Sequence, residues 1–217
     1  MLLAVDTSTS RAGIALYDGD VIAETTWLAG RDHGRHLMPV IQETLQRLGR
    51  QPADLTAVAA ARGPGSFTGL RVGLAVAQGL RVALGIPLYG VGSLEVLAHG
   101  LPPMGRAVRA VLAAGRGRFA TARFQEDGLG GYIQADKVMG VDLATLLRLA
   151  DEQCMIVGDL DSEARQQLAA PGVGATVASP ALCVRRPGVL AELAWQRFQA
   201  GDPPGADAGE PIYLARE

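Results

Sequence analysis

Residues that could do chemistry first occur in a turn that follows the short apolar run Leu2–Val5. An aspartate and several hydroxyl groups in a tight turn suit phosphate oxygens, and an aspartate at the end of a strand suits a hydrated metal ion. The same residue types also satisfy a hairpin turn without any ligand. The residues alone leave both interpretations open. They are Asp6, Thr7, Ser8 and Thr9.

A glycine-rich segment, Arg62–Gly73, is the second candidate site. Gly65 permits a sharp turn, Ser66 is suited to cap the helix that follows, and the amides of a helix start attract anions. The segment is not a P-loop, because it lacks the lysine, and Pro64 stands where the elbow of a serine nucleophile has glycine. It predicts phosphate contacts at Gly65 and Ser66, or else a turn that only holds the helix against a sheet.

Side chains that commonly bind metals are few in this chain. His33 and His36 are three residues apart, so they could share a helix face and bind a metal, although such a pair at a helix start is more often solvated or capping. The third histidine is His99, and no His-Glu-x-x-His motif occurs. Cys154 and Cys183 lie in apolar segments typical of a core. We therefore predict no catalytic residue and no metal ligand.

The elements that must position these residues alternate along the first half of the chain. Three strands joined by short turns, one of them Asp18-Gly19, predict an antiparallel meander. Strands and helices then alternate, which predicts a mixed sheet covered by helices, an α/β fold. The first expected helix runs from about His36 to Leu48, because Pro39 suits a first turn and Gly49 ends the pattern. The other expected helices are 70–84 and 93–99, and the expected strands are 2–6, 13–17, 21–28, 55–61 and 86–91.

The second half repeats a weaker version of the same pattern, which suggests an internal duplication. Leu101-Pro102-Pro103 is the best candidate for the boundary, so we expect lobes at 1–103 and 104–217, with the C-terminal helix able to pack back on the first lobe. The expected strands are 108–113, 119–125, 131–138 and 155–158, and the expected helices are 142–149, 161–168 and 188–199.

Composition limits the partners of this chain. Its 217 residues are 48% hydrophobic and 19% charged, as in an ordinary globular protein. The formal net charge is −2, Lys137 is the single lysine, and no basic stripe is visible, so any RNA is expected to be bound through a partner. No signal peptide and no run of roughly 20 apolar residues is found, so we expect a cytoplasmic protein without a membrane segment.

Two segments carry a resemblance to a known family. Leu-Ala-Val-Asp-Thr-Ser-Thr near the start and Arg-Gly-Pro-Gly-Ser-Phe-Thr-Gly-Leu-Arg-Val-Gly from Arg62 are similar to the TsaB (YeaZ) family, closely over residues 1–100 and loosely beyond, to the tail that begins at Pro211. The resemblance implies the actin-like ATPase fold, in two lobes with mixed β-sheets flanked by helices. It also implies a non-catalytic subunit that activates the transferase TsaD, which adds a threonylcarbamoyl group to N6 of adenosine 37 in tRNAs reading codons that begin with A.

The resemblance further implies that the ATPase TsaE is a second partner, that tRNA binds only through the complex, and that the isolated chain can form a homodimer. No cofactor is expected to be required, with weak ATP or ADP binding as an option. TsaD carries a metal-binding His-x-x-x-His where this chain has Ser93 and Leu97, and the family's acidic second-lobe turn is replaced by the segment 113–118. Two alternatives stay open: a free-standing actin-fold ATPase or phosphotransferase, and an M22-type metallopeptidase.

The resemblance also places the partner interface on the two long helices of the first lobe, which would form a four-helix bundle with the same two helices of the partner. Gly69 and Gly73 share a helix face with Ala77, and such small-residue faces allow another helix to approach closely. The alternative is that this face packs against the chain's own neighbouring helix. The predicted interface residues are His33, Arg35, Met38, Gln42, Gly69, Leu70, Gly73, Leu74 and Ala77.

Overall fold

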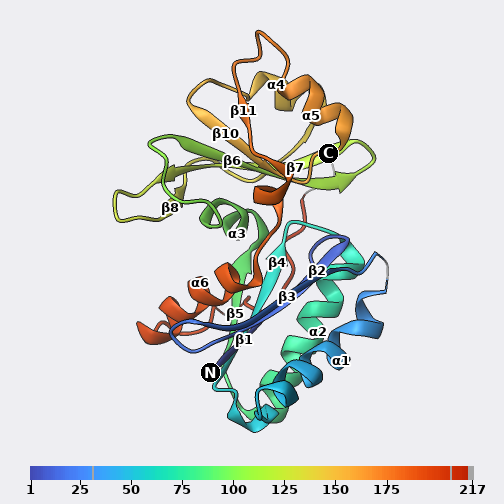
Figure 1. The fold of residues 1–217 in the computed structure, drawn as a ribbon, viewed down its shortest axis with the longest axis vertical. Coiled ribbons are helices and arrows are strands. Elements are labelled where there is room, and N and C mark those ends of the chain that lie inside the picture. Colours follow the sequence, from blue (N-terminus) through green and yellow to red (C-terminus); the bar gives the residue numbers. More distant parts are fainter. Residues whose placement is uncertain (31, 206, 215–217) are drawn as a thin grey trace. The chain divides into compact units, whose positions relative to one another are not determined.

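The structure, a computed structural model, describes residues 1–30, 32–205 and 207–214. The chain divides into two compact units (Figure 1). The first unit contains Met1–Ser93 and Arg186–Tyr213, and the second contains Leu94–Arg185 and Leu214. Only part of the expected C-terminal tail lies within the described residues.

The first unit is built on a five-stranded mixed sheet with the strand order β3-β2-β1-β4-β5. The first three strands form the predicted antiparallel meander, and Gly19 takes the positive φ of 88° that the turn between the second and third strands needs. The other two strands run parallel to the first, which requires helical crossovers. The strands are β1 Leu2–Asp6, β2 Arg11–Tyr17, β3 Val21–Leu28, β4 Ala57–Gly63 and β5 Leu88–Gly92.

Helices cover both faces of this sheet. Figure 1 shows α1 (His33–Arg47) and α2 (Phe67–Leu84) together on one side and α6 (Pro187–Gln199) on the other. Each helix buries an apolar stripe against the strands, as the 3.6-residue period requires. The fully or almost fully buried helix residues include Leu37, Ile41 and Leu45 of α1, Leu70 and Ala77 of α2, and Leu190, Ala191 and Ala194 of α6. The short elements are η1 (Pro52–Asp54) and α3 (Ser93–His99).

Local signals predicted the ends of α2 better than the start of α1. The Ser66 hydroxyl caps α2 by accepting a hydrogen bond from the Gly69 amide, at 3.3 Å, and Gly85 ends the helix with φ 66°. In contrast, α1 begins at His33 rather than near His36, so Pro39 lies inside the helix. A proline at this depth cannot donate the backbone hydrogen bond of its turn.

The second unit has a six-stranded sheet with the order β11-β10-β6-β7-β8, and β9 also pairs with β7. The antiparallel pair of β6 and β7, with β10 parallel to β6 on the other side, repeats the arrangement of β1, β2 and β4. The predicted caps Asp142 and Asp161 begin the two helices. The elements are β6 Ala107–Gly115, β7 Arg118–Glu126, β8 Tyr132–Gln134, β9 Met139–Asp142, α4 Leu143–Arg148, β10 Cys154–Gly158, α5 Ser162–Leu168, β11 Thr176–Val177 and η2 Pro180–Cys183.

Two mixed sheets flanked by helices, with one strand order used twice, confirm the predicted α/β fold of the actin-like class. The domain boundaries differ from the prediction. The units divide after Ser93 rather than after residue 103. Residues 186–213 return to the first unit, in agreement with the expectation that the C-terminal helix is able to pack back on it. Leu101 belongs to the core of the second unit, and the Tyr132 hydroxyl donates to the Pro102 carbonyl at 3.0 Å. The Pro-Pro signal therefore marks the loop that follows α3, not the boundary.

Among the described residues, α2 is the one helix whose length and composition would let it cross a bilayer. A core helix of a folded domain meets the same two criteria. Here 28% of the helix is buried, and its inner stripe, Leu70, Leu74 and Ala77, lies in the first unit. The rest of this apolar helix is at least partly exposed.

We predict that Leu190→Ala, on the inner face of α6, lowers the free energy of unfolding of the first unit by about 2–5 kcal/mol. Leu190 is 0% exposed, so the truncation leaves a cavity. Urea unfolding followed by tryptophan fluorescence measures this unit alone, because both tryptophans, Trp27 and Trp195, lie in it. The control is Leu28→Ala, 73% exposed in the same unit, which should change stability by less than about 0.5 kcal/mol. Equal losses in the two variants would contradict the α6 packing.

Candidate functional site

The hydroxyl-rich turn between β1 and β2 is buried, and its polar groups bond to the chain itself. Asp6, Thr7, Ser8 and Thr9 are each at most 8% exposed. The Ser8 amide and hydroxyl both donate to Asp6 Oδ1, at 2.8 and 2.6 Å. This is the local turn that such residues form without a ligand.

The small-residue face of α2 packs directly on this turn. The Thr7 hydroxyl donates to the Gly69 carbonyl oxygen at 2.7 Å. A Cβ atom at Gly69 would overlap the Thr7 carbonyl oxygen, and one at Gly73 would overlap the Thr7 hydroxyl. Glycine is therefore needed at both positions because the chain's own turn occupies the space that a side chain would fill.

The glycine-rich turn before α2 lies against the same segment. The Ser66 amide donates to the Ser8 carbonyl oxygen at 2.6 Å, and a Cβ at Gly65 would overlap that oxygen. The structure thus brings Gly65 and Ser66 beside Asp6–Thr9, as the phosphate hypothesis requires. However, the Thr7 and Ser8 hydroxyls and the Ser66 amide already donate to groups of the chain. Nucleotide binding at these residues stays a prediction.

Residues 200–205 and 207–213, the C-terminal strap, reach the carboxyl ends of β4 and β5. Arg62 Nε donates to the Glu210 carbonyl oxygen at 2.9 Å, and the Arg62 guanidinium pairs with Asp207. The Ile212 amide donates to the Arg62 carbonyl oxygen at 2.7 Å. This ion pair lowers the pKa of the Asp207 carboxyl. In open α/β sheets, ligands bind outside the carboxyl ends of the strands, and here the strap lies at those ends.

The two nearby histidines do not form a site together. His36 is exposed, whereas His33 is 3% exposed and its Nδ1 has no hydrogen-bond partner among the described residues. Burial lowers the pKa of His33, and the negative charge of Asp6 partly opposes this shift. A buried imidazolium cation without hydrogen-bond partners has a high free energy, so the neutral form of His33 is favoured. The structure places His33 inside the first unit rather than on its surface, and its predicted role in a partner interface stays a prediction.

The predicted interface separates into an outer and an inner set. Arg35, Met38 and Gln42 are exposed on α1. The five α2 residues of the prediction are all buried within the first unit, because this face contacts the β1–β2 turn rather than a second helix. They are Gly69, Leu70, Gly73, Leu74 and Ala77. The outward stripe of α2 consists instead of Thr68, Arg71, Ala75, Gly79 and Val82, which are exposed.

Other candidate groups are placed as follows. Among the described residues, no three His, Cys, Asp or Glu side chains gather in a way that could hold a metal ion. Ser93 is buried and its hydroxyl has no partner among the described residues, and Leu97 lies in the core of the second unit. Both cysteines are buried as predicted, and burial raises the pKa of the Cys154 thiol to about 11.

Comparison with known proteins agrees with this fold and these motifs. Residues 5–154 match the family model described as TsaD, tRNA N6-adenosine threonylcarbamoyltransferase. A crystal structure of a Pseudomonas aeruginosa protein with similarity to peptidase YeaZ superposes with a TM-score of 0.79, at 25% identity, over 99% of both chains. The class is therefore that of the α/β proteins related to this transferase.

Two curated relatives identify the family within that class. The Bacillus subtilis protein named tRNA threonylcarbamoyladenosine biosynthesis protein TsaB is 34% identical over 170 residues, which is 77% of this chain and 74% of the relative. The Escherichia coli protein of the same name is 35% identical over 131 residues, 59% of this chain and 57% of the relative. The chain belongs to the TsaB/YeaZ family.

We predict opposite effects for alanine at two glycines of α2. Gly73→Ala places a methyl group against the Thr7 hydroxyl and should lower the free energy of unfolding by about 1–3 kcal/mol. Gly79→Ala meets no atom within 4 Å and should raise it by about 0.5–1 kcal/mol through helix propensity. Urea midpoints at constant m, followed by tryptophan fluorescence, measure both. A neutral or stabilising effect of Gly73→Ala would refute the packing described for this turn.

We also predict a pH dependence that arises from His33. Because the pKa of His33 is lower in the folded state, the unfolded chain binds this proton more readily below about pH 6.5. The free energy of unfolding should therefore fall as the pH decreases from about 7.5 to 6.0, above the range of most carboxyl groups. His33→Gln should show a smaller fall than wild type in this interval, and the difference between the two should stay constant above pH 7.5. An equal fall in both would show that His33 is not the group responsible.

Proposed function

We propose that this chain is a non-catalytic, activating subunit in the synthesis of N6-threonylcarbamoyladenosine at position 37 of tRNA, and that it binds a TsaD-type transferase. The names of the curated relatives and the match to the transferase family model support this assignment. In this proposal the transferase supplies the chemistry, and the ATPase TsaE acts on the same complex. The cytoplasm is then the expected location.

The outward face of α2 is the observation that carries the docking part of this proposal. Val82 is 80% exposed, although an apolar side chain of this size is stabilised by burial. Gly79, on the same stripe, is solvent-exposed within the helix, which costs about 1 kcal/mol relative to alanine. Met38 and Gln42 add exposed positions on the neighbouring helix α1. The C-terminal part of the stripe, Ala75, Gly79 and Val82, is small and apolar, which favours close packing of another helix on this side.

The partner that fits this face is a chain with the same two helices. The transferase family model matches residues 5–154, a range that includes both α1 and α2, so a transferase of this family has corresponding helices. Packing two equivalent helix pairs around a local two-fold axis produces a four-helix bundle, and two copies of this chain could use the same face. With a net charge of −2, the chain offers tRNA little electrostatic attraction of its own, which supports binding through the complex.

We predict that Val82→Glu abolishes or strongly weakens binding to the transferase subunit of the same organism. A carboxylate buried between packed helices loses water without gaining a partner, so the dissociation constant should rise at least about tenfold, as measured by calorimetry with the two purified proteins. Leu129→Glu is the matched control, because Leu129 is an exposed apolar residue, 92% accessible, in the second unit. Unchanged affinity for a folded Val82→Glu variant would reject this face as the docking surface.

A further inference from the structure

The second unit contains an open cavity of about 590 Å³ to which the proposed function gives no role. Its lining is strongly polar and carries both signs of charge. The charged lining residues are Arg106, Arg123, Glu126 and Glu152. The volume lies within the range of about 300–1,000 Å³ that is typical of small-molecule sites.

The strand register explains why a cavity forms here. Cys154 of β10 pairs with Ala107 of β6, so this row of the sheet carries small side chains. The next row that faces the same way carries two large ones, because Arg109 of β6 pairs directly with Arg123 of β7. The cavity therefore lies beside the small Ala107 side chain and is bordered by Gln125 of β7 and by Arg123 of the next row.

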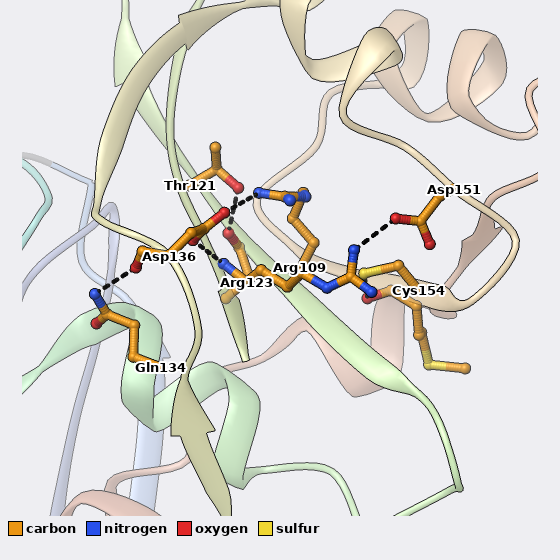
Figure 2. Close-up of polar contacts among 9 residues, drawn as sticks. Arg109, Thr121, Arg123, Gln134, Asp136, Asp151 and Cys154 are labelled. Atoms are coloured by element: carbon orange, nitrogen blue, oxygen red, sulfur yellow. Dashed lines mark hydrogen bonds and ion pairs between the residues drawn. The ribbon is translucent and has the colours of Figure 1, made fainter. Parts of the chain in front are cut away.

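Two aspartates hold these neighbouring arginines in place (Figure 2). Arg109 donates to Asp136 at 3.2 Å, and Arg123 donates to Asp151 at 2.7 Å. Asp136 also accepts the backbone amide of Arg123 at 2.6 Å. Two like charges directly opposite each other on neighbouring strands destabilise a sheet. Such an unfavourable pair is expected where a functional site needs the positive charges. The Nε atoms of both arginines are buried without a partner among the described residues.

The other side of the cavity is also fixed by the backbone. Glu126 Oε1 accepts hydrogen bonds from the amides of Met104 and Gly105, and its second oxygen accepts none from the residues that the structure describes. Arg106 donates to the Thr176 hydroxyl at 3.0 Å. Charged groups of both signs are therefore held in defined positions before any ligand arrives, as a preorganised site requires.

We propose that this cavity binds a small zwitterion of the free-peptide type, with one carboxylate and one ammonium group. The carboxylate would pair with Arg106 and Arg123, whose guanidinium groups match its planar geometry. The ammonium group would pair with Glu126 and Glu152. Because the lining has two positive and two negative side chains, a ligand that carries both charges is favoured over a simple anion or cation. The site lies in one unit and does not depend on the proposed function.

The test uses the full chain and three matched probes: trialanine with both ends free, N-acetyl-trialanine and trialanine amide. Nuclear magnetic resonance titration to about 10 mM covers millimolar affinity. Saturable shifts are expected for trialanine at the amides around Gly105 and Gln153, with at least tenfold weaker binding of both blocked probes. No saturable shifts, or equal binding of N-acetyl-trialanine, would overturn the proposal.

Two variants at the edge of the cavity localise the binding. Arg106→Gln and Glu152→Gln should each weaken trialanine binding about tenfold, the loss of one ionic contact. Arg50→Gln, an exposed arginine of the first unit, is the matched control and should bind as wild type does. If the two cavity variants bind like this control, the ion pairs around Arg109 and Arg123 serve only the fold of the sheet. Binding to the transferase subunit, measured separately, should be unchanged in all three variants.

Discussion

The contact between the β1–β2 turn and the glycine face of α2 is the constraint on which the rest of the first unit depends. Thr7 donates to the Gly69 carbonyl, and the missing side chain of Gly73 leaves space for the same hydroxyl. A helix held this closely to a turn cannot rotate, so the stripe that ends at Val82 must face outward. The surface proposed to face the partner is thus oriented by a contact on the opposite side of the helix.

The same contact also determines which polar groups of the turn could bind a ligand. Asp6, Ser8 and Ser66 bond to one another, and Arg62 is joined to the C-terminal strap. A site that acts on phosphates needs such donors to face the ligand, preorganised and unpaired. Here they link the turn, the helix start and the strap to one another. This arrangement agrees with the proposed role of a subunit that presents a surface to a partner.

The features that could be predicted from the sequence are those that depend on residues adjacent in the chain. The meander, the caps at Ser66, Asp142 and Asp161, and the glycine that ends α2 follow from local backbone preferences. The orientation of the α2 glycines did not, because Thr7 and Gly69 are 62 positions apart. A small-residue face shows that something approaches closely, but its sequence is the same whether a partner helix or the chain's own turn occupies it. The return of α6 to the first unit is also a long-range contact, and the prediction allowed for it.

The second unit shows that a repeated topology does not repeat its chemistry. Its strand order corresponds to that of the first sheet, with β6, β7 and β10 in the places of β1, β2 and β4. In the first unit these strands are almost entirely apolar and are covered by helices. In the second, Arg109 and Arg123 stand in the paired strands and require two aspartates for balance. Apolar residues would stabilise the sheet without that desolvation cost, so stability alone does not explain why the paired strands carry these charges.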